Sequence, residues 1–443
     1  MTRNRLIRKS IHLLTGLAIL LLSFWIEKKT LFFIILTGSV FAFATYNYSR
    51  FSLLHKTADA SLGTLFYPLG VITAFLLLYN KPIQFFQISL LILTVSDTAA
   101  NITGQFRPGN IYFNAFREEK SLYGVLGFGL TALLIFRMLL PESDFGLSAY
   151  ILLAILLAIT FEVVSYKGSD NFSIPVGSAL FFLIMDHFEG NLLFLILVLI
   201  LSAAASWFFY YRGVLTKNGS LVMYFMGLYF LGVLGWTWTL PLLAFFVSSV
   251  LLTALHTYQQ KKKRSDNRRN AWQVLANGLG AILFSAGFLL LGDPLMIYFF
   301  ISVVAAVTAD TWASEVGPVF HKRCFSLSDF RMRASGVSGG ISPAGSLAAL
   351  VGSFTIVILA AVLFNLSGEP YLLIALGLSG FFASFTDTFL GAFVEKKLET
   401  LAFFREHKHK ESLSPNDVVN IAGSMSAAVF FIFFMMMMGN SNF

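Results

Sequence analysis

The chain has 443 residues, of which 57% are hydrophobic and only 12% are charged, and its mean hydropathy is +0.76. Soluble domains carry roughly 25% charged residues, so this composition excludes a soluble globular protein. The formal charge of +8 does not support nucleic-acid binding, because the basic residues are distributed as in a membrane protein. The single cysteine, Cys324, excludes an internal disulfide and a multi-cysteine metal site.

Apolar runs long enough to cross a bilayer as helices recur along the whole chain. We expect an all-α, polytopic membrane protein with about 15 transmembrane helices. The expected spans are 11–26, 30–46, 64–79, 85–103, 121–140, 146–165, 172–187, 192–211, 219–235, 237–257, 272–292, 295–316, 341–364, 371–391 and 417–438.

The basic residues alternate between loops along this series of spans. Nearly all of them fall at the N-terminus and in every second loop; the exceptions are Lys28, Lys29, Lys81 and Arg137. The positive-inside rule therefore places the N-terminus in the cytoplasm and the protein in the cytoplasmic membrane. An acidic outer loop at 186–191 suggests a boundary between two catalytic halves, residues 1–187 and 192–443.

Polar residues in the first half gather at the predicted cytoplasmic ends of spans. Arg8, His12 and Gly16 lie one helical turn apart at the start of the first span. A histidine there can contact phosphate or accept a proton, although a lone interfacial histidine also serves as a snorkelling side chain.

The fourth span ends with Asp97, Thr98 and Gly104, and the fifth begins with Lys120-Ser121-Leu122-Tyr123-Gly124. A carboxylate for Mg²⁺, a lysine for phosphate, and a hydroxyl with glycine amides at a helix N-terminus are the groups that a nucleoside triphosphate site requires.

Two further acids follow in the first half. Glu162 lies about one turn before the end of the sixth span, and an acid in a membrane helix is by default a candidate functional residue. Asp170 and Asn171 precede the seventh span, where they could join the site or simply cap the helix.

In this order, the first ~187 residues resemble the phytol kinase and dolichol kinase family of CTP-dependent lipid-alcohol kinases. The residues that carry the resemblance are Arg8-Lys9, His12, Gly16, Asp97-Thr98, Gly104, Lys120-Ser121, Gly124, Glu162, Asp170-Asn171 and Pro175. Val125 departs from the family, which usually has a small hydroxyl residue after the glycine.

The second half repeats the acid and glycine pattern. Asp310, Ser314 and Gly317 share one helical face and are followed by Ser342 and Gly345, at offsets that echo Asp97, Asn101 and Gly104 with Ser121 and Gly124. A shorter version is Asp387-Thr388-Phe389-Leu390-Gly391. The glycines could serve only close helix packing, but packing does not explain acids on the same stripe.

From about residue 192 onward the chain resembles the family that includes the plant phytyl-phosphate kinase. The matching segments are 273–278, 309–317, 336–345, 387–391 and 416–420. The only departure is Thr388, where serine would be equally ordinary.

Together the two resemblances imply a fused enzyme that uses CTP and Mg²⁺ to phosphorylate an isoprenoid alcohol and then its monophosphate, with active sites that face the cytoplasm and no nucleic-acid partner. Asp97, Asp310 and Asp387 are the expected metal ligands. Catalytic roles are expected for Asp97, Lys120, Glu162, Asp170, Asp310, Glu315, Asp387 and Asp417. Cofactor binding is expected of Arg8, His12, Thr98, Gly104, Ser121, Gly124, Asn171, Asn277, Thr311, Gly317, Ser338, Gly339, Gly340, Ser342, Gly345, Asn416 and Asn420.

Two alternatives stay open. A cytidylyltransferase that makes a CDP-linked lipid would use the same Mg²⁺ and CTP but attack a different phosphorus. A secondary transporter also combines internal repeats with polar residues inside the membrane.

Overall fold

The computed structural model describes residues 3–45, 63–106, 108–115, 118–140, 149–165, 168–188, 191–259, 268–401, 404 and 412–438, and the side chains of residues 3–9, 115, 118 and 259 lie outside this description. The chain forms two compact units, Met1–Leu197 (unit 1) and Val198–Phe443 (unit 2). The predicted boundary in the loop at 186–191 lies shortly before this division; residues 189 and 190 are outside the described part.

Unit 1 is a helical bundle built around one buried helix. Its helices are α1 (Arg3–Leu22), α2 (Lys28–Thr45), α4 (Gly63–Leu77), α5 (Ile83–Leu91), η2 (Ile92–Ser96), α6 (Asp97–Thr103), α7 (Leu122–Leu139), α8 (Ala149–Val164), α9 (Asp170–His187) and the start of α10 (Leu192–Tyr211). Helix α9 is buried along most of its length and packs against α4, α5 and α8. Gly70 of α4 permits the close approach, because a Cβ there would lie 2.3 Å from the carbonyl oxygen of Asn171.

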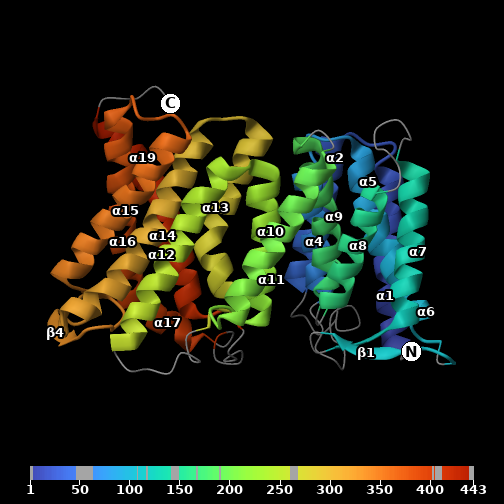
Figure 1. Cartoon of the computed structure of the whole chain (residues 1–443), viewed down its shortest axis with the longest axis horizontal. Coiled ribbons are helices and arrows are strands. Elements are labelled where there is room, and N and C mark those ends of the chain that lie inside the picture. Colours follow the sequence, from blue (N-terminus) through green and yellow to red (C-terminus); the bar gives the residue numbers. More distant parts are fainter. Residues whose placement is uncertain are drawn as a thin grey trace. The chain divides into compact units, whose positions relative to one another are not determined.

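The fourth predicted span is a continuous helix with a π-helical turn, η2, directly before Asp97. Such wide turns inside α-helices are frequent at functional sites. A short antiparallel hairpin, β1 (Tyr112–Ala115) with β2 (Glu118–Ser121), then leads into α7. Within unit 1, the N-terminus, α6 and β1 lie at the same end of the bundle (Figure 1).

Unit 2 is also organised around a central helix. It contains the rest of α10, α11 (Lys217–Gly227), η3 (Leu228–Leu234), α12 (Trp236–Gln259), α13 (Ala271–Leu291), α14 (Leu295–Phe320), α15 (Pro343–Leu363), α16 (Pro370–Phe393), α17 (Glu395–Thr400) and α19 (Pro415–Met437). Helix α14 contacts α12, α13, α15, α16 and α19. A small sheet of β3 (Arg323–Ser326), β4 (Arg331–Ala334) and β5 (Gly340–Ile341), in the order β4-β3-β5, joins α14 to α15.

The described helices confirm a mainly helical polytopic membrane protein. Ten of them are long and apolar enough to span a membrane, and three shorter apolar segments lie at Ser10–Leu22, Gly63–Leu77 and Ala149–Val164. Each of the predicted spans overlaps a helix or a run of helices. The two small sheets differ from the all-α expectation, because the charged loops after Gly104 and after Phe320 are long enough to fold back on themselves as hairpins.

Candidate catalytic sites in the two units

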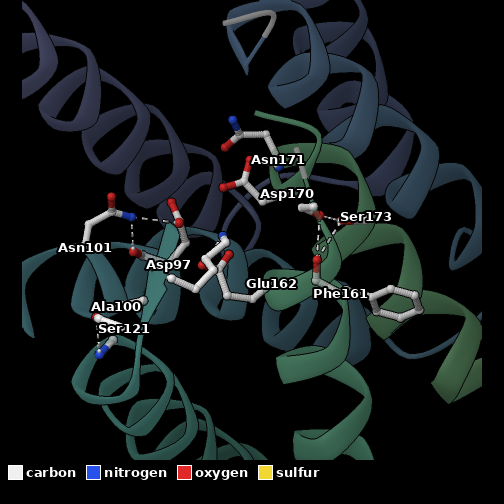
Figure 2. Close-up of polar contacts among 12 residues, drawn as sticks. Asp97, Ala100, Asn101, Ser121, Phe161, Glu162, Asp170, Asn171 and Ser173 are labelled. Atoms are coloured by element: carbon white, nitrogen blue, oxygen red, sulfur yellow. Dashed lines mark hydrogen bonds and ion pairs between the residues drawn. The ribbon is translucent and has the colours of Figure 1, made fainter. Parts of the chain in front are cut away.

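Three carboxylates from different helices converge in unit 1. Asp97 begins α6, Glu162 lies near the end of α8, and Asp170 begins α9. One oxygen of each lies within 4.8 Å of one oxygen of the other two, and Figure 2 shows the three side chains directed toward a common point. Asp97 and Glu162 are only 3% and 7% exposed. The fold therefore brings together acids that are up to 73 positions apart in the sequence, the distance from Asp97 to Asp170.

Lys120 and Asn101 position two of these acids. The Lys120 ammonium on β2 lies 2.8 Å from Oε1 of Glu162. Asn101, one turn after Asp97, donates to Asp97 Oδ1 at 3.0 Å. The other oxygen of Glu162, Oε2, is buried without a hydrogen-bond partner among the described residues. A buried acceptor of this kind is costly unless a proton or a cation satisfies it, so the acids fit a divalent cation.

The remaining predicted residues of unit 1 have mixed surroundings. His12 stacks on Tyr67 with ring centroids 4.6 Å apart. Thr98 donates to the carbonyl of Thr94 in its own helix, at 2.6 Å. Asn171 donates to the carbonyls of Gly63 and Gly168, so its amide joins the first residue of α4 and the turn before α9 to the start of α9. The side chain of Arg8 lies outside the described residues.

Gly104, Ser121 and Gly124 form one contact where α6 meets the start of α7. Ser121 is the N-cap of α7, and its hydroxyl accepts from the amide of Gly124 at 3.1 Å. A Cβ on Gly104 would lie 2.9 Å from that hydroxyl and 3.7 Å from the Cα of Gly124. Both glycines are thus needed for the helix end to approach the capped N-terminus.

Unit 2 repeats this contact with the corresponding residues. Ser342 is the N-cap of α15 and accepts from the amide of Gly345 at 3.1 Å. A Cβ on Gly317 would lie 2.9 Å from the Ser342 hydroxyl and 3.6 Å from the Cα of Gly345. The repeated sequence motif therefore also has a repeated local geometry. In each unit, a hairpin or small sheet connects the helix that carries the aspartate to the helix that begins at the capping serine.

The acids of unit 2 share a pocket. Asp310 of α14 and Asp387 of α16 line it together with Asn277 of α13 and Asn420 of α19. The other residues that line the pocket are aliphatic or hydroxyl-bearing, among them Val307, Ser384 and Ser424. Four predicted site residues from four helices thus meet in one place. Two carboxylates in one membrane pocket repel each other unless a proton or cation lies between them.

Glycine again permits the approach of the helices. A Cβ on Gly423 of α19 would lie 2.7 Å from Oδ2 of Asp387, so α16 and α19 pack closely at the acid. Asp417, one turn before Asn420, is 1% exposed and forms a capping box with Ser414. Its Oδ2 accepts from the backbone amide and the hydroxyl of Ser414, at 2.8 and 2.7 Å. Asp417 therefore organises the start of α19 and does not line the pocket.

Glu315 faces a different neighbour from Asp310. It accepts from the Thr253 hydroxyl at 2.6 Å and lies 2.7 Å from Nδ1 of His256, both on α12. Five residues along an α-helix turn a side chain well away from the starting direction, which explains why the two acids of one motif separate. Thr253 and His256 were not singled out from the sequence, because a single polar residue in an apolar helix carries no pattern.

The Gly/Ser-rich loop of unit 2 contacts the end of α16 and the start of α17. The Ser338 hydroxyl donates to Glu395 Oε2 at 2.5 Å. Gly339 has φ of 76° and packs where a Cβ would lie 2.5 Å from the Cβ of Ala392. Gly340 pairs with β3 and approaches the thiol of Cys324. Among the other predicted residues, Thr311 is half-buried and Asn416 is exposed, and neither lines the pocket.

The fold and the buried acids define a polytopic integral membrane protein. The chain belongs to the family of integral membrane proteins called DUF92, which matches residues 200–428. It is also similar to an uncharacterized membrane protein of Methanocaldococcus jannaschii, with 32% identity over 180 residues that cover 40% of this chain and 73% of that protein. No solved structure matches the chain. The family match includes every residue of the unit 2 pocket, whereas unit 1 precedes it.

Proposed function

We propose that the protein phosphorylates an isoprenoid alcohol in unit 1 and the resulting monophosphate in unit 2, with a nucleoside triphosphate, CTP by resemblance, as the donor. The observation that carries the proposal is the meeting of Asp97, Glu162 and Asp170 at one point beside Lys120. Phosphoryl transfer needs charge neutralisation and positioning more than covalent catalysis, and this set of side chains is suited to both tasks.

In unit 1, the three acids would hold Mg²⁺, which neutralises charge on the transferred phosphoryl group. Lys120 is paired with Glu162 in this structure and would contact a phosphate oxygen of the donor. Lys120 sits on β2, directly before the capped start of α7. The amides at that start point toward the same end of the bundle and favour an anion.

In unit 2, Asp310 and Asp387 would hold the cation, and the amides of Asn277 and Asn420 would donate to phosphate oxygens. The described residues that line this pocket include no lysine or arginine. Such a site carries less positive charge than unit 1, so the cation would supply most of the neutralisation. The resemblance of this half to the phytyl-phosphate kinase family supports a phosphate as its acceptor.

The test is the purified full chain with CTP labelled in its γ-phosphate, a panel of isoprenoid alcohols and Mg²⁺, with products separated as mono- and diphosphates. We expect labelled monophosphate first, then diphosphate, together with CDP. Pyrophosphate and a CDP-lipid would instead identify a cytidylyltransferase. Nucleotide-independent counterflow of substrate in proteoliposomes, without either product, would identify a transporter.

A further inference from the structure

The hairpin between α14 and α15 carries an apolar face that no other described part of the chain covers. Phe325 of β3 is paired with Met332 of β4, and Phe330 lies with its ring 6.3 Å from that of Phe325. Their exposed fractions are 40%, 59% and 69% for Phe325, Met332 and Phe330. Three large apolar side chains grouped on one face indicate an interaction surface, whereas single exposed apolar residues do not.

On the opposite face of the hairpin the β3 residues are buried, whereas β4 is exposed along its whole length. Cys324 and Ser326 alternate with the exposed residues of β3 and are 3% and 2% exposed. The Ser326 and Ser328 hydroxyls are hydrogen-bonded at 2.9 Å, although Ser328, in the turn, is itself exposed. The loop after β4 is fixed to α16 by the close contact of Gly339 with Ala392. The hairpin is therefore a held element with one outward apolar face, and its orientation follows from the strand alternation.

Basic residues lie beside the apolar face: Arg323 shares the outward side of β3 with Phe325, whereas Arg331, paired with Ser326, alternates to the other side. Lys322, Arg323 and Arg331 are exposed, and the acid in the turn, Asp329, is bonded to Arg333. The hairpin thus presents net positive charge beside its aromatic side chains. Aromatic and basic side chains together are suited to an anionic bilayer, which has an apolar interior beneath negatively charged headgroups.

The position of the hairpin along the chain points to the same surface. It begins after α14 ends at Phe320 and finishes where α15 begins at Pro343, and both helices are candidate membrane spans. A segment of this length between two adjacent spans emerges at the headgroup level of the bilayer. We propose that the hairpin rests on the membrane with Phe325, Phe330 and Met332 in the interfacial zone and its basic side chains on anionic headgroups. Because the same segment is fixed to α16, it would set the depth of the helix end that follows Asp387.

The depth of single side chains tests the proposal without any assay of activity. The full chain with Cys324→Ser and Phe330→Cys is spin-labelled in nanodiscs that contain phosphatidylglycerol, and its accessibility to oxygen and to a nickel chelate is measured. The matched control places the label at Ser328→Cys, an exposed polar position in the turn of the same hairpin. We expect oxygen to be the better relaxant at 330 and the nickel chelate at 328. Greater accessibility to nickel at both positions would overturn the proposal.

Two further arms cover folding and lipid charge. Met332→Cys provides a second outward label in case Phe330→Cys perturbs the hairpin. The label at 332 should show the oxygen preference that is expected at 330. A label at 330 or 332 that is immobile and shielded from both relaxants would show that protein covers the face, which overturns the proposal. In phosphatidylcholine alone, the label at 330 should become more accessible to the nickel chelate. An unchanged depth would overturn the role given to the basic side chains.

Discussion

At the scale of single residues, the separation of the acids into two clusters predicts separable reactions. Asp97 belongs to the unit 1 cluster and Asp310 to the unit 2 pocket. Asp97→Asn should lower monophosphate formation by about 100-fold or more, a typical cost of removing one charge-stabilising group, and leave conversion of monophosphate to diphosphate intact. Asp310→Asn should make monophosphate accumulate.

The measurement is product analysis with alcohol and with monophosphate supplied separately. Asp293→Asn, in the short connection before α14, is a control that should change neither reaction. Loss of both reactions in either site variant, with thermal unfolding unchanged, would contradict the assignment of one site to each unit.

The pair Lys120 and Glu162 allows structural and catalytic roles to be distinguished. Lys120 and Glu162 are poorly exposed, with side chains 14% and 9% accessible. Lys120→Met leaves a buried carboxylate uncompensated, which costs about 3 kcal/mol or more, so the unfolding temperature should fall. The double variant with Lys120→Met and Glu162→Gln should recover most of the lost unfolding temperature. Phosphorylation of the alcohol should stay low in both variants, and recovery of activity with stability would show that the pair is only structural.

Cys324 should be a slow thiol whose reactivity depends on pH. Burial raises the pKa of its thiol above the usual value for cysteine. Alkylation requires the thiolate, so the rate at pH 8 should be low and should keep rising at pH values where an exposed thiol has already levelled off. The comparison is iodoacetamide labelling of the native chain and of Cys324→Ser with Ser328→Cys. Equal rates in the two proteins would contradict the burial of Cys324.

At the scale of elements, the contact between glycine and the capping serine should stabilise the packing of α14 on α15, and of α6 on α7. Gly317→Ala would place a Cβ 2.9 Å from the hydroxyl that caps α15. Displacing the cap costs about 1 kcal/mol. The temperature of thermal unfolding should therefore fall for Gly317→Ala, and for Gly104→Ala in unit 1 for the same reason.

A double-mutant cycle identifies the cause. In a Ser342→Ala background the added methyl group no longer meets the hydroxyl, so Gly317→Ala should cost less than in the native chain. Gly38→Ala in α2, where a Cβ would meet nothing within 4 Å, should be neutral or slightly stabilising. Additive costs at Gly317 and Ser342 would show that the contact does not couple the two helices.

The same elements show what sequence patterns can and cannot predict. Hydrophobic length is a local property, so the spans were predictable from apolar runs. Asp310 and Asp387 could be singled out because acids in apolar helices are costly unless they are used, and the family resemblance added Asn277 and Asn420, but their meeting in one pocket is seen only in the structure. Neither the neighbour of Glu315 nor the π-turn before Asp97 was predictable, because both depend on packing against helices distant in sequence.

At the scale of the whole molecule, the distribution of basic residues predicts on which side each connection lies. Within unit 2, the helices alternate in direction, so the hairpin after α14 and the segment after α16 share one end of the unit and the connection from α15 to α16 lies at the other. Figure 1 shows β4 and α17 at the same end of unit 2. Residues 141–145, the connection between the fifth and sixth predicted spans, lie outside the described residues.

Single cysteines introduced into a Cys324→Ser background would test this arrangement in intact cells and in inverted membrane vesicles. Ser328→Cys and Asn114→Cys, one in each hairpin, should react with an impermeant maleimide only from the cytoplasmic side, because Lys and Arg concentrate in those loops. Ser367→Cys, in the connection from α15 to α16, should react only from outside. Both hairpins must be cytoplasmic if a nucleotide is to reach both clusters of acids. Reaction of Ser328→Cys and Asn114→Cys from opposite sides would therefore contradict the proposal that one cytoplasmic donor serves both units. Reaction of Ser328→Cys and Ser367→Cys from the same side would contradict the membrane crossing by α15, which joins these two positions.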